Sequence, residues 1–126
     1  MEEFNTRSIR LPNGRVIRAE VMTHPQDMAR GMMFRDSLAP DRGMLFVHGG
    51  PGHYNYWMYQ VRIPLDILWL DGNRAIVEMS PNTPPCTTNA NECPSYGGNE
   101  EALMILELAA GSIERHGLRL GDRLNF

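Results

Sequence analysis

Lysine is absent from this chain of 126 residues, so all 12 of its basic side chains are arginines. The planar guanidinium group of arginine favours carboxylate and phosphate partners, which it can bind through two hydrogen bonds. A codon usage biased toward arginine explains the absence of lysine equally well. The formal net charge of −3 argues against nucleic acid as a partner, because nucleic-acid-binding domains usually carry a basic surface.

Long apolar runs are also missing, which excludes a hydrophobic membrane-spanning helix. The two most apolar stretches, residues 63–70 and 102–110, are each interrupted by one acid, Asp66 and Glu107. The acidic start of the chain lacks the basic and apolar regions of a signal peptide. The length predicts a single domain over residues 1–126. We expect a soluble protein, cytoplasmic unless a bacterial export signal has been removed from it.

Cysteines are few, and the two that occur, Cys86 and Cys93, lie in a segment rich in proline. Their spacing is wider than that of the cysteine pairs in zinc sites, and no second ligand pair lies nearby, so we expect no metal. The two thiols either form a disulfide or stay free. A disulfide would close a loop of 8 residues and would stabilise the fold by roughly 2.5 kcal/mol.

Motifs of cofactor-dependent and nucleophilic enzymes are absent as well. The turn rich in glycine at residues 49–52 precedes no helix, so we do not expect it to hold a phosphate group. No histidine lies beside a serine or cysteine in a pattern typical of a nucleophile. We therefore expect no cofactor, and the sequence favours a non-enzymatic protein.

What the chain does contain is a series of short apolar segments separated by turn residues, which predicts a mainly β domain. Residues 13–14 (Asn-Gly) are typical of a hairpin turn, and residues 71–73 join a second hairpin. Thr23 has the spacing of a capping box, so we expect a short helix over residues 24–30 that ends at Gly31.

About eight short strands and one or two short helices predict a single-domain β-sandwich or a flattened β-barrel. Strands are expected at residues 8–11, 15–22, 43–48, 54–59, 65–70, 75–79, 103–108 and 123–126. A helical turn is expected at 112–116, capped by Ser112 and ended by Gly117. Residues 49–52 are expected to form a turn. Residues 81–99 are expected to form a long loop without regular structure, and loops of that length in compact domains are usually functional.

Asp66 and Glu107 are the most informative side chains, because each interrupts an apolar strand. A carboxylate in a strand that is buried on both faces needs a hydrogen bond or a charge partner. The two carboxylates could converge on one site for acid–base chemistry. Alternatively, each accepts hydrogen bonds from backbone N–H groups or arginines and only fixes a loop.

Aromatic residues gather around Trp57, with tyrosines at positions 54, 56 and 59. Such rings can stack on a sugar or another flat ligand. Aromatic side chains in strands also serve as core and cross-strand packing. The residues alone favour packing, and the binding hypothesis stays open beside it.

Several motifs follow one another along the chain from Gly31 to Asp122. They are Gly31-Met32-Met33-Phe34-Arg35, Gly43-Met44-Leu45-Phe46-Val47, Trp57-Met58, Ile63-Pro64-Leu65-Asp66-Ile67, Pro85-Cys86, Leu106-Glu107-Leu108 with Gly111, Gly117, and Gly121-Asp122. Together they resemble the DUF192 family over about residues 15–126, and the ordered set is far more specific than any one motif.

The resemblance implies a mainly β fold of sandwich or barrel type and a domain without an assigned biochemical function. Many relatives look exported, which makes a disulfide between Cys86 and Cys93 more plausible. The motif positions suggest as binding candidates Arg35, Trp57, Met58, Asp66 and Cys86.

From these features we expect a non-enzymatic module that binds a small polar or carbohydrate-like molecule, or a protein. Trp57, Asp66 and Arg35 would lie near a groove covered by the loop at residues 81–99. One alternative is a hydrolase-like enzyme in which Asp66 and Glu107 act as a carboxylate pair. Another is a structural partner in an envelope assembly, which predicts an exposed apolar patch and no small-molecule pocket.

Overall fold

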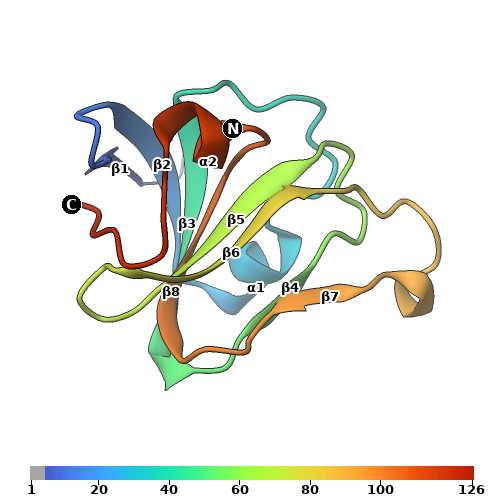
Figure 1. Cartoon of the computed structure of the whole chain (residues 1–126). Helices are drawn as coiled ribbons and strands as arrows, with labels where there is room; N and C mark the ends of the chain where they lie inside the picture. Colours follow the sequence, from blue (N-terminus) through green and yellow to red (C-terminus); the bar gives the residue numbers. More distant parts are fainter. Residues whose placement is uncertain (1–4) are drawn as a thin grey trace.

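The computed structural model describes residues 5–126, and it confirms a mainly β domain with eight strands and two short helices (Figure 1). The elements in chain order are β1 (Thr6–Arg10), β2 (Val16–Met22), α1 (Pro25–Arg30), β3 (Arg42–Gly52), β4 (Asn55–Trp57), β5 (Leu65–Leu70), β6 (Ile76–Thr83), the 3-10 helix η1 (Ala90–Glu92), β7 (Ser95–Gly97), β8 (Ala102–Ala109) and α2 (Ser112–His116). In the part of the chain that the structure describes, no helix has the length and hydropathy of a membrane span.

Six strands form one mixed sheet in the order β1-β2-β3-β8-β5-β6, and β4 pairs with β7 in a separate two-stranded sheet. β1 and β6 are the edges of the large sheet, so the described strands do not close into a barrel. β1 and β2 are antiparallel around the turn at residues 13–14, as the sequence predicts. β2 and β3 are parallel, and α1 lies in the connection between them.

β8 occupies the middle of the large sheet, between β3 and β5, although it comes last of the strands along the chain. Both neighbours are antiparallel to it. A strand with partners on both sides and side chains covered on both faces has no contact with solvent along most of its length. This central place carries Glu107 into the interior of the molecule.

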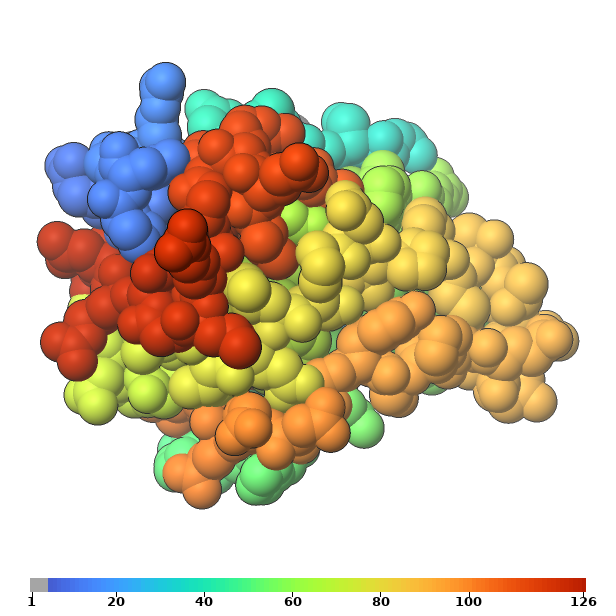
Figure 2. Space-filling view, in the orientation of Figure 1, coloured from blue at the N-terminus to red at the C-terminus, as the bar shows by residue number. Residues whose placement is uncertain are grey.

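The large sheet has a hydrophobic core on each face, because side chains alternate along each strand. On β5, Leu68 and Leu70 face one core, whereas Ile67 and Trp69 face the other. The first core is covered by α2 and the C-terminal segment, which Figure 2 shows in red beside the blue N-terminal strands. The second core is covered by α1, β4 and β7.

Three segments differ from the sequence predictions. β3 continues through residues 49–52, which were expected to form a turn. β6 extends to Thr83, and η1 and β7 lie within residues 81–99, where no regular structure was expected. Residues 123–126 form only isolated bridges rather than a strand. For β3, β6 and β7, pairing with another segment decides the conformation, which local composition does not report.

The residues that cap the two helices agree with the predictions at the C-terminal ends and differ from them at the N-terminal ends. Gly31 ends α1 with a φ of 49°, as expected. The residue before α1 is His24, and it makes no side-chain capping bond, so the predicted capping by Thr23 is wrong. Gly111, not Ser112, precedes α2; the Ser112 hydroxyl donates instead to the carbonyl of Ala109 at 2.6 Å.

Gly97 allows β7 to pack closely on the second core, because a Cβ atom at this position would lie 2.0 Å from the indole of Trp69. We predict that Gly97→Ala lowers the free energy of unfolding by about 1–3 kcal/mol through overpacking. Gly49→Ala is the matched control, since a Cβ atom there would meet nothing within 4 Å. Urea unfolding measures both variants, and equal midpoints for the two would contradict the prediction.

Candidate functional site

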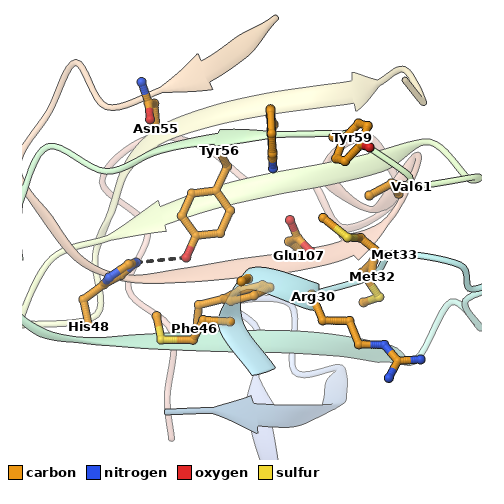
Figure 3. Close-up of a pocket in the computed structure, with 14 residues that line it drawn as sticks. Arg30, Met32, Met33, Phe46, His48, Asn55, Tyr56, Tyr59, Val61 and Glu107 are labelled. Atoms are coloured by element: carbon orange, nitrogen blue, oxygen red, sulfur yellow. Dashed lines mark hydrogen bonds between the residues drawn. The ribbon is translucent and has the colours of Figure 1, made fainter. Parts of the chain in front are cut away.

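A cavity of about 250 Å³ lies between α1, β4 and the large sheet (Figure 3). α1 and the residues after it form one wall, β4 and the residues after it form another, and β3 and β8 form the floor. The lining residues are Met28, Ala29, Arg30, Gly31, Met32, Met33, Phe46, His48, Asn55, Tyr56, Trp57, Tyr59, Val61 and Glu107.

The floor of the cavity follows from strand register. Phe46 and His48 are two residues apart on β3 and therefore point to the same face. Glu107 of β8 lies opposite Met44 of β3 on one side and opposite Ile67 of β5 on the other. Met44 and Ile67 are both fully buried in the second core. The carboxyl group thus rises from the middle of an apolar sheet face into the cavity.

Gly31 sets the distance between α1 and this floor. A Cβ atom at this position would lie 3.3 Å from the ring of Phe46, so the end of the helix sits against that ring. Its φ of 49° belongs to the region that glycine tolerates best. The glycine therefore both ends α1 and brings the methionines beside it over the sheet.

Glu107 is only 4% exposed, and none of the described residues donates a hydrogen bond to its carboxyl group, whose oxygens open onto the cavity. Burial raises the pKa of Glu107 to about 8, and the positive charge of Arg35 opposes this rise. Removal of a carboxylate from water favours its neutral form. In the empty cavity at pH 7, Glu107 is therefore mostly protonated.

Arg35 pairs with Glu20 and makes no hydrogen bond to Asp66. Its Nη1 and Nη2 atoms donate to the two carboxylate oxygens of Glu20 at 2.5 and 3.1 Å. Arg35 lines a second groove of about 280 Å³, which shares Arg30, Gly31 and Met33 with the cavity. Arg35 thus acts on Glu107 through its charge and does not line the cavity.

His48 and Tyr56 form a neutral polar pair beside Glu107. The His48 Nε2 and Tyr56 Oη atoms are 2.9 Å apart, and the Tyr54 ring stacks on His48 at 3.6 Å between centroids. Burial lowers the pKa of His48, so the imidazole is neutral at pH 7. Burial, with the charge of Glu107 adding to it, raises the pKa of Tyr56. Neither ring brings a charge to the cavity at neutral pH.

Asp66 is fully buried but does not line the cavity. Its Oδ1 accepts a hydrogen bond from the backbone N–H of Asn82 at 2.7 Å, and its Oδ2 accepts one from Ile113 at 2.8 Å. These bonds tie the end of β6 to the start of α2. The side chain therefore joins two segments of backbone that lie far apart in the sequence.

Asp66 and Glu107 project from opposite faces of the large sheet. Across β5 and β8, Asp66 pairs with Leu108, whereas Ile67 pairs with Glu107. Residues that pair across strands share a face, and neighbours along a strand do not. The two carboxyl groups therefore cannot act on one substrate, which corrects the expectation that they form a catalytic pair.

Of the other binding candidates, Trp57 lines the cavity and Met58 does not. Trp57 is 42% exposed at the cavity edge, with its ring 5.0 Å from that of Tyr59. Met58 points the other way and is fully buried in the second core. No residue of the segment 81–99 lines the cavity, so the expectation that this segment covers the groove is wrong.

Cys86 is bonded to the segment that follows β4, which forms one wall of the cavity. It forms a disulfide with Cys93, one of the two states that the sequence allowed. The backbone N–H of Cys86 donates to Met58 at 3.1 Å, and its carbonyl accepts from Gln60 at 2.9 Å. The disulfide thereby fastens the segment that follows β4. Cys86 is not a lining residue.

The sequence of this chain matches one known protein family over most of its length. A family model for DUF192, described as "Uncharacterized ACR", matches residues 8–126. The chain belongs to the DUF192 family.

Two solved structures are similar to this chain over nearly its whole length. A "putative transcription regulator" from Sinorhizobium meliloti 1021 is 29% identical with a TM-score of 0.89, covering 99% of this chain and 96% of its own. A protein of unknown function from Novosphingobium aromaticivorans DSM 12444 is 25% identical with a TM-score of 0.87, covering 98% and 86%. No curated protein matches this chain.

Sequence reasoning about this DUF192 domain missed Met28, Ala29 and His48 as cavity residues. α1 has only 6 residues and ends before Gly31, so Met32 lies beyond the helix and no helical spacing marks Met28 as a residue of the cavity wall. The meeting of His48 with Tyr56 depends on how β4 folds back across β3, and no local pattern reports it.

Asp66 of the DUF192 domain provides the first test of this assignment of roles. We predict that Asp66→Asn lowers the free energy of unfolding by roughly 1.5–3 kcal/mol, because one backbone donor loses its charged acceptor. Asp36→Asn is the control: Asp36 makes an exposed ion pair with Arg62 and should change stability little. Denaturant titration compares the two, and an unchanged midpoint for Asp66→Asn would contradict the structural role.

Glu107 provides a second test through the pH dependence of stability. The unfolded chain releases this proton near pH 4.5, whereas the folded chain holds it up to about pH 8. Folded protein binds more protons in this window, so raising the pH favours unfolding by up to about 1.4 kcal/mol per pH unit. Glu107→Gln should remove that slope, and we expect the difference between the two proteins to grow from pH 5 to pH 8. Parallel stability curves would refute the prediction.

Proposed function

We propose that this DUF192 domain is a non-enzymatic module that binds a small molecule with a polar head group in the cavity beside Glu107. The observation that carries this proposal is a carboxyl group that is only 4% exposed, accepts no hydrogen bond from the described residues and opens onto the cavity. Burial of such a group costs free energy unless a partner satisfies it. A ligand that reaches the cavity floor supplies that partner.

The rest of the cavity supports a ligand with an apolar or flat body. Phe46 and Tyr56 contribute ring surface inside, and Trp57 contributes an exposed ring at the edge. Small-molecule sites commonly combine apolar walls with a few polar groups that fix orientation. A small polar ligand fits this pattern, and a carbohydrate-like ring is one body that Trp57 could stack on.

The other hypotheses have less support. A hydrolase that uses Asp66 and Glu107 needs both groups on one face of the sheet, and they lie on opposite faces. A structural partner in an envelope assembly needs no small-molecule pocket. One similar structure, from Sinorhizobium meliloti, is described as a transcription regulator, but the net charge of −3 of this chain argues against nucleic acid as its partner.

Blocking the cavity tests the proposal without touching Glu107. Ala29 is exposed on α1 at the cavity edge, so Ala29→Phe should fill the entrance with little effect on stability. Gln26→Phe adds the same ring to an exposed position of α1 that does not line the cavity. Both variants are screened by thermal shift against a set of monosaccharides, amines, alcohols and carboxylic acids.

We expect compounds that raise the melting temperature of the parent protein and of Gln26→Phe, and that lose this effect on Ala29→Phe. A ligand present at 100 times its Kd adds ~2.7 kcal/mol of stability, which such a screen detects. Compounds that stabilise Ala29→Phe as strongly as the parent would contradict the proposal. So would a screen in which no compound stabilises the parent.

A further inference from the structure

The charges around the cavity point to the chemical class of the ligand. We propose that its head group is a primary ammonium group, which Glu107 binds as a carboxylate at the cavity floor. This inference rests on the proposed function, because it assigns a ligand class to the same cavity. It is carried by the balance of charge around Glu107 and by the rings that surround it.

Arg35 does not pair directly with Glu107, because its guanidinium is bound to Glu20, although its charge still lowers the pKa of Glu107. The bidentate contact between Arg35 and Glu20 joins one positive and one negative group, so the two together carry no net charge. An ionised Glu107 then leaves one negative charge in the interior. A single positive charge on a ligand would neutralise it.

The groups that face Glu107 from the other elements do not supply that positive charge. On β3 the nearest polar ring is His48, which is neutral and bonded to Tyr56 of β4. On α1, Arg30 lines the cavity, but its guanidinium points away from Glu107 (Figure 3). The space next to the carboxyl group is therefore left for a cation that comes from outside.

The ring surfaces beside Glu107 also suit a cation. Phe46 and Tyr56 meet edge to face, with their centroids 5.1 Å apart and their planes at 81°. The face of an aromatic ring is negative and attracts an ammonium group, most strongly where water is excluded. The methionines of the opposite wall, Met32 and Met33, offer polarisable contacts to the apolar body of the ligand.

An ammonium group matches Glu107 better than the other common head groups. It carries three donors and no acceptor, and an ionised carboxylate is an acceptor only. A hydroxyl group carries no charge, so it would leave Glu107 protonated and could form only neutral hydrogen bonds with it, which are weaker than those to a charged group. A ligand carboxylate would repel the ionised form of Glu107 and could meet only its protonated form.

Binding of an ammonium group also requires that Glu107 release its proton to the buffer, and the number of protons released can be measured. The protonated carboxyl of the empty cavity releases its proton to the buffer and becomes the carboxylate that pairs with the ammonium. The ligand keeps its own proton throughout, so one proton leaves for each amine bound. A neutral head group would bind without this release.

Isothermal titration calorimetry at pH 7 with benzylamine, benzyl alcohol and benzoate separates the head groups on one common ring. Measurement in two buffers of different ionisation enthalpy gives the number of protons released. We expect benzylamine to bind at least tenfold more tightly than the other two and to release close to one proton. The Ala29→Phe variant should bind none of them.

Glu107→Gln keeps the size of the side chain but removes its charge, so we expect it to lose at least tenfold in benzylamine affinity and all of the proton release. Glu114→Gln is the control, because Glu114 is exposed on α2 and does not line the cavity. If Glu107→Gln does not fold, proton release by the parent protein still decides the question.

Three outcomes would overturn the amine assignment. Benzyl alcohol or benzoate could bind in the same cavity as tightly as benzylamine, which would leave the proposed function standing without its ligand class. Benzylamine could bind without releasing a proton, with the same consequence. Failure of all three compounds to bind, together with a thermal-shift screen that stabilises nothing, would overturn both proposals.

Discussion

Desolvation of the Glu107 carboxyl group is the constraint around which this side of the molecule is organised. The group rises from the central strand between Met44 and Ile67, is 4% exposed at the floor of the cavity and accepts no hydrogen bond from the described residues. The positive charge of Arg35 lowers the pKa of Glu107 and so opposes the effect of burial, although Arg35 itself is paired with Glu20. The fold thus tolerates, in the middle of its central strand, an acid whose pKa is raised to about 8.

The two acids of the apolar strands show how one strand pattern serves two purposes. Asp66 faces the first core, where two backbone N–H groups satisfy it and fix the start of α2. Glu107 faces the second core, where α1 and β4 stand away from the sheet and leave a cavity. The difference of one position in register decides which acid becomes part of the framework and which faces a potential ligand.

Much of the framework could be predicted from the sequence, because it depends on local chemistry. The Asn13-Gly14 hairpin, the buried strand β5 and the helix end at Gly31 all have such signals. β7 could not be predicted, since it forms only because β4 offers a partner.

For the site, Glu107 and Trp57 stood out in the sequence, whereas Ala29 and His48 did not. A cavity between separate elements depends on how far those elements stand apart, and the close approach at Gly31 sets that distance.

The raised pKa of Glu107 is tested most directly by an NMR titration of its carboxyl carbon in the protein without ligand. The Glu107→Gln variant assigns the signal. The account predicts a midpoint near pH 8; a midpoint near the ordinary value for glutamate, about 4.3, would contradict it.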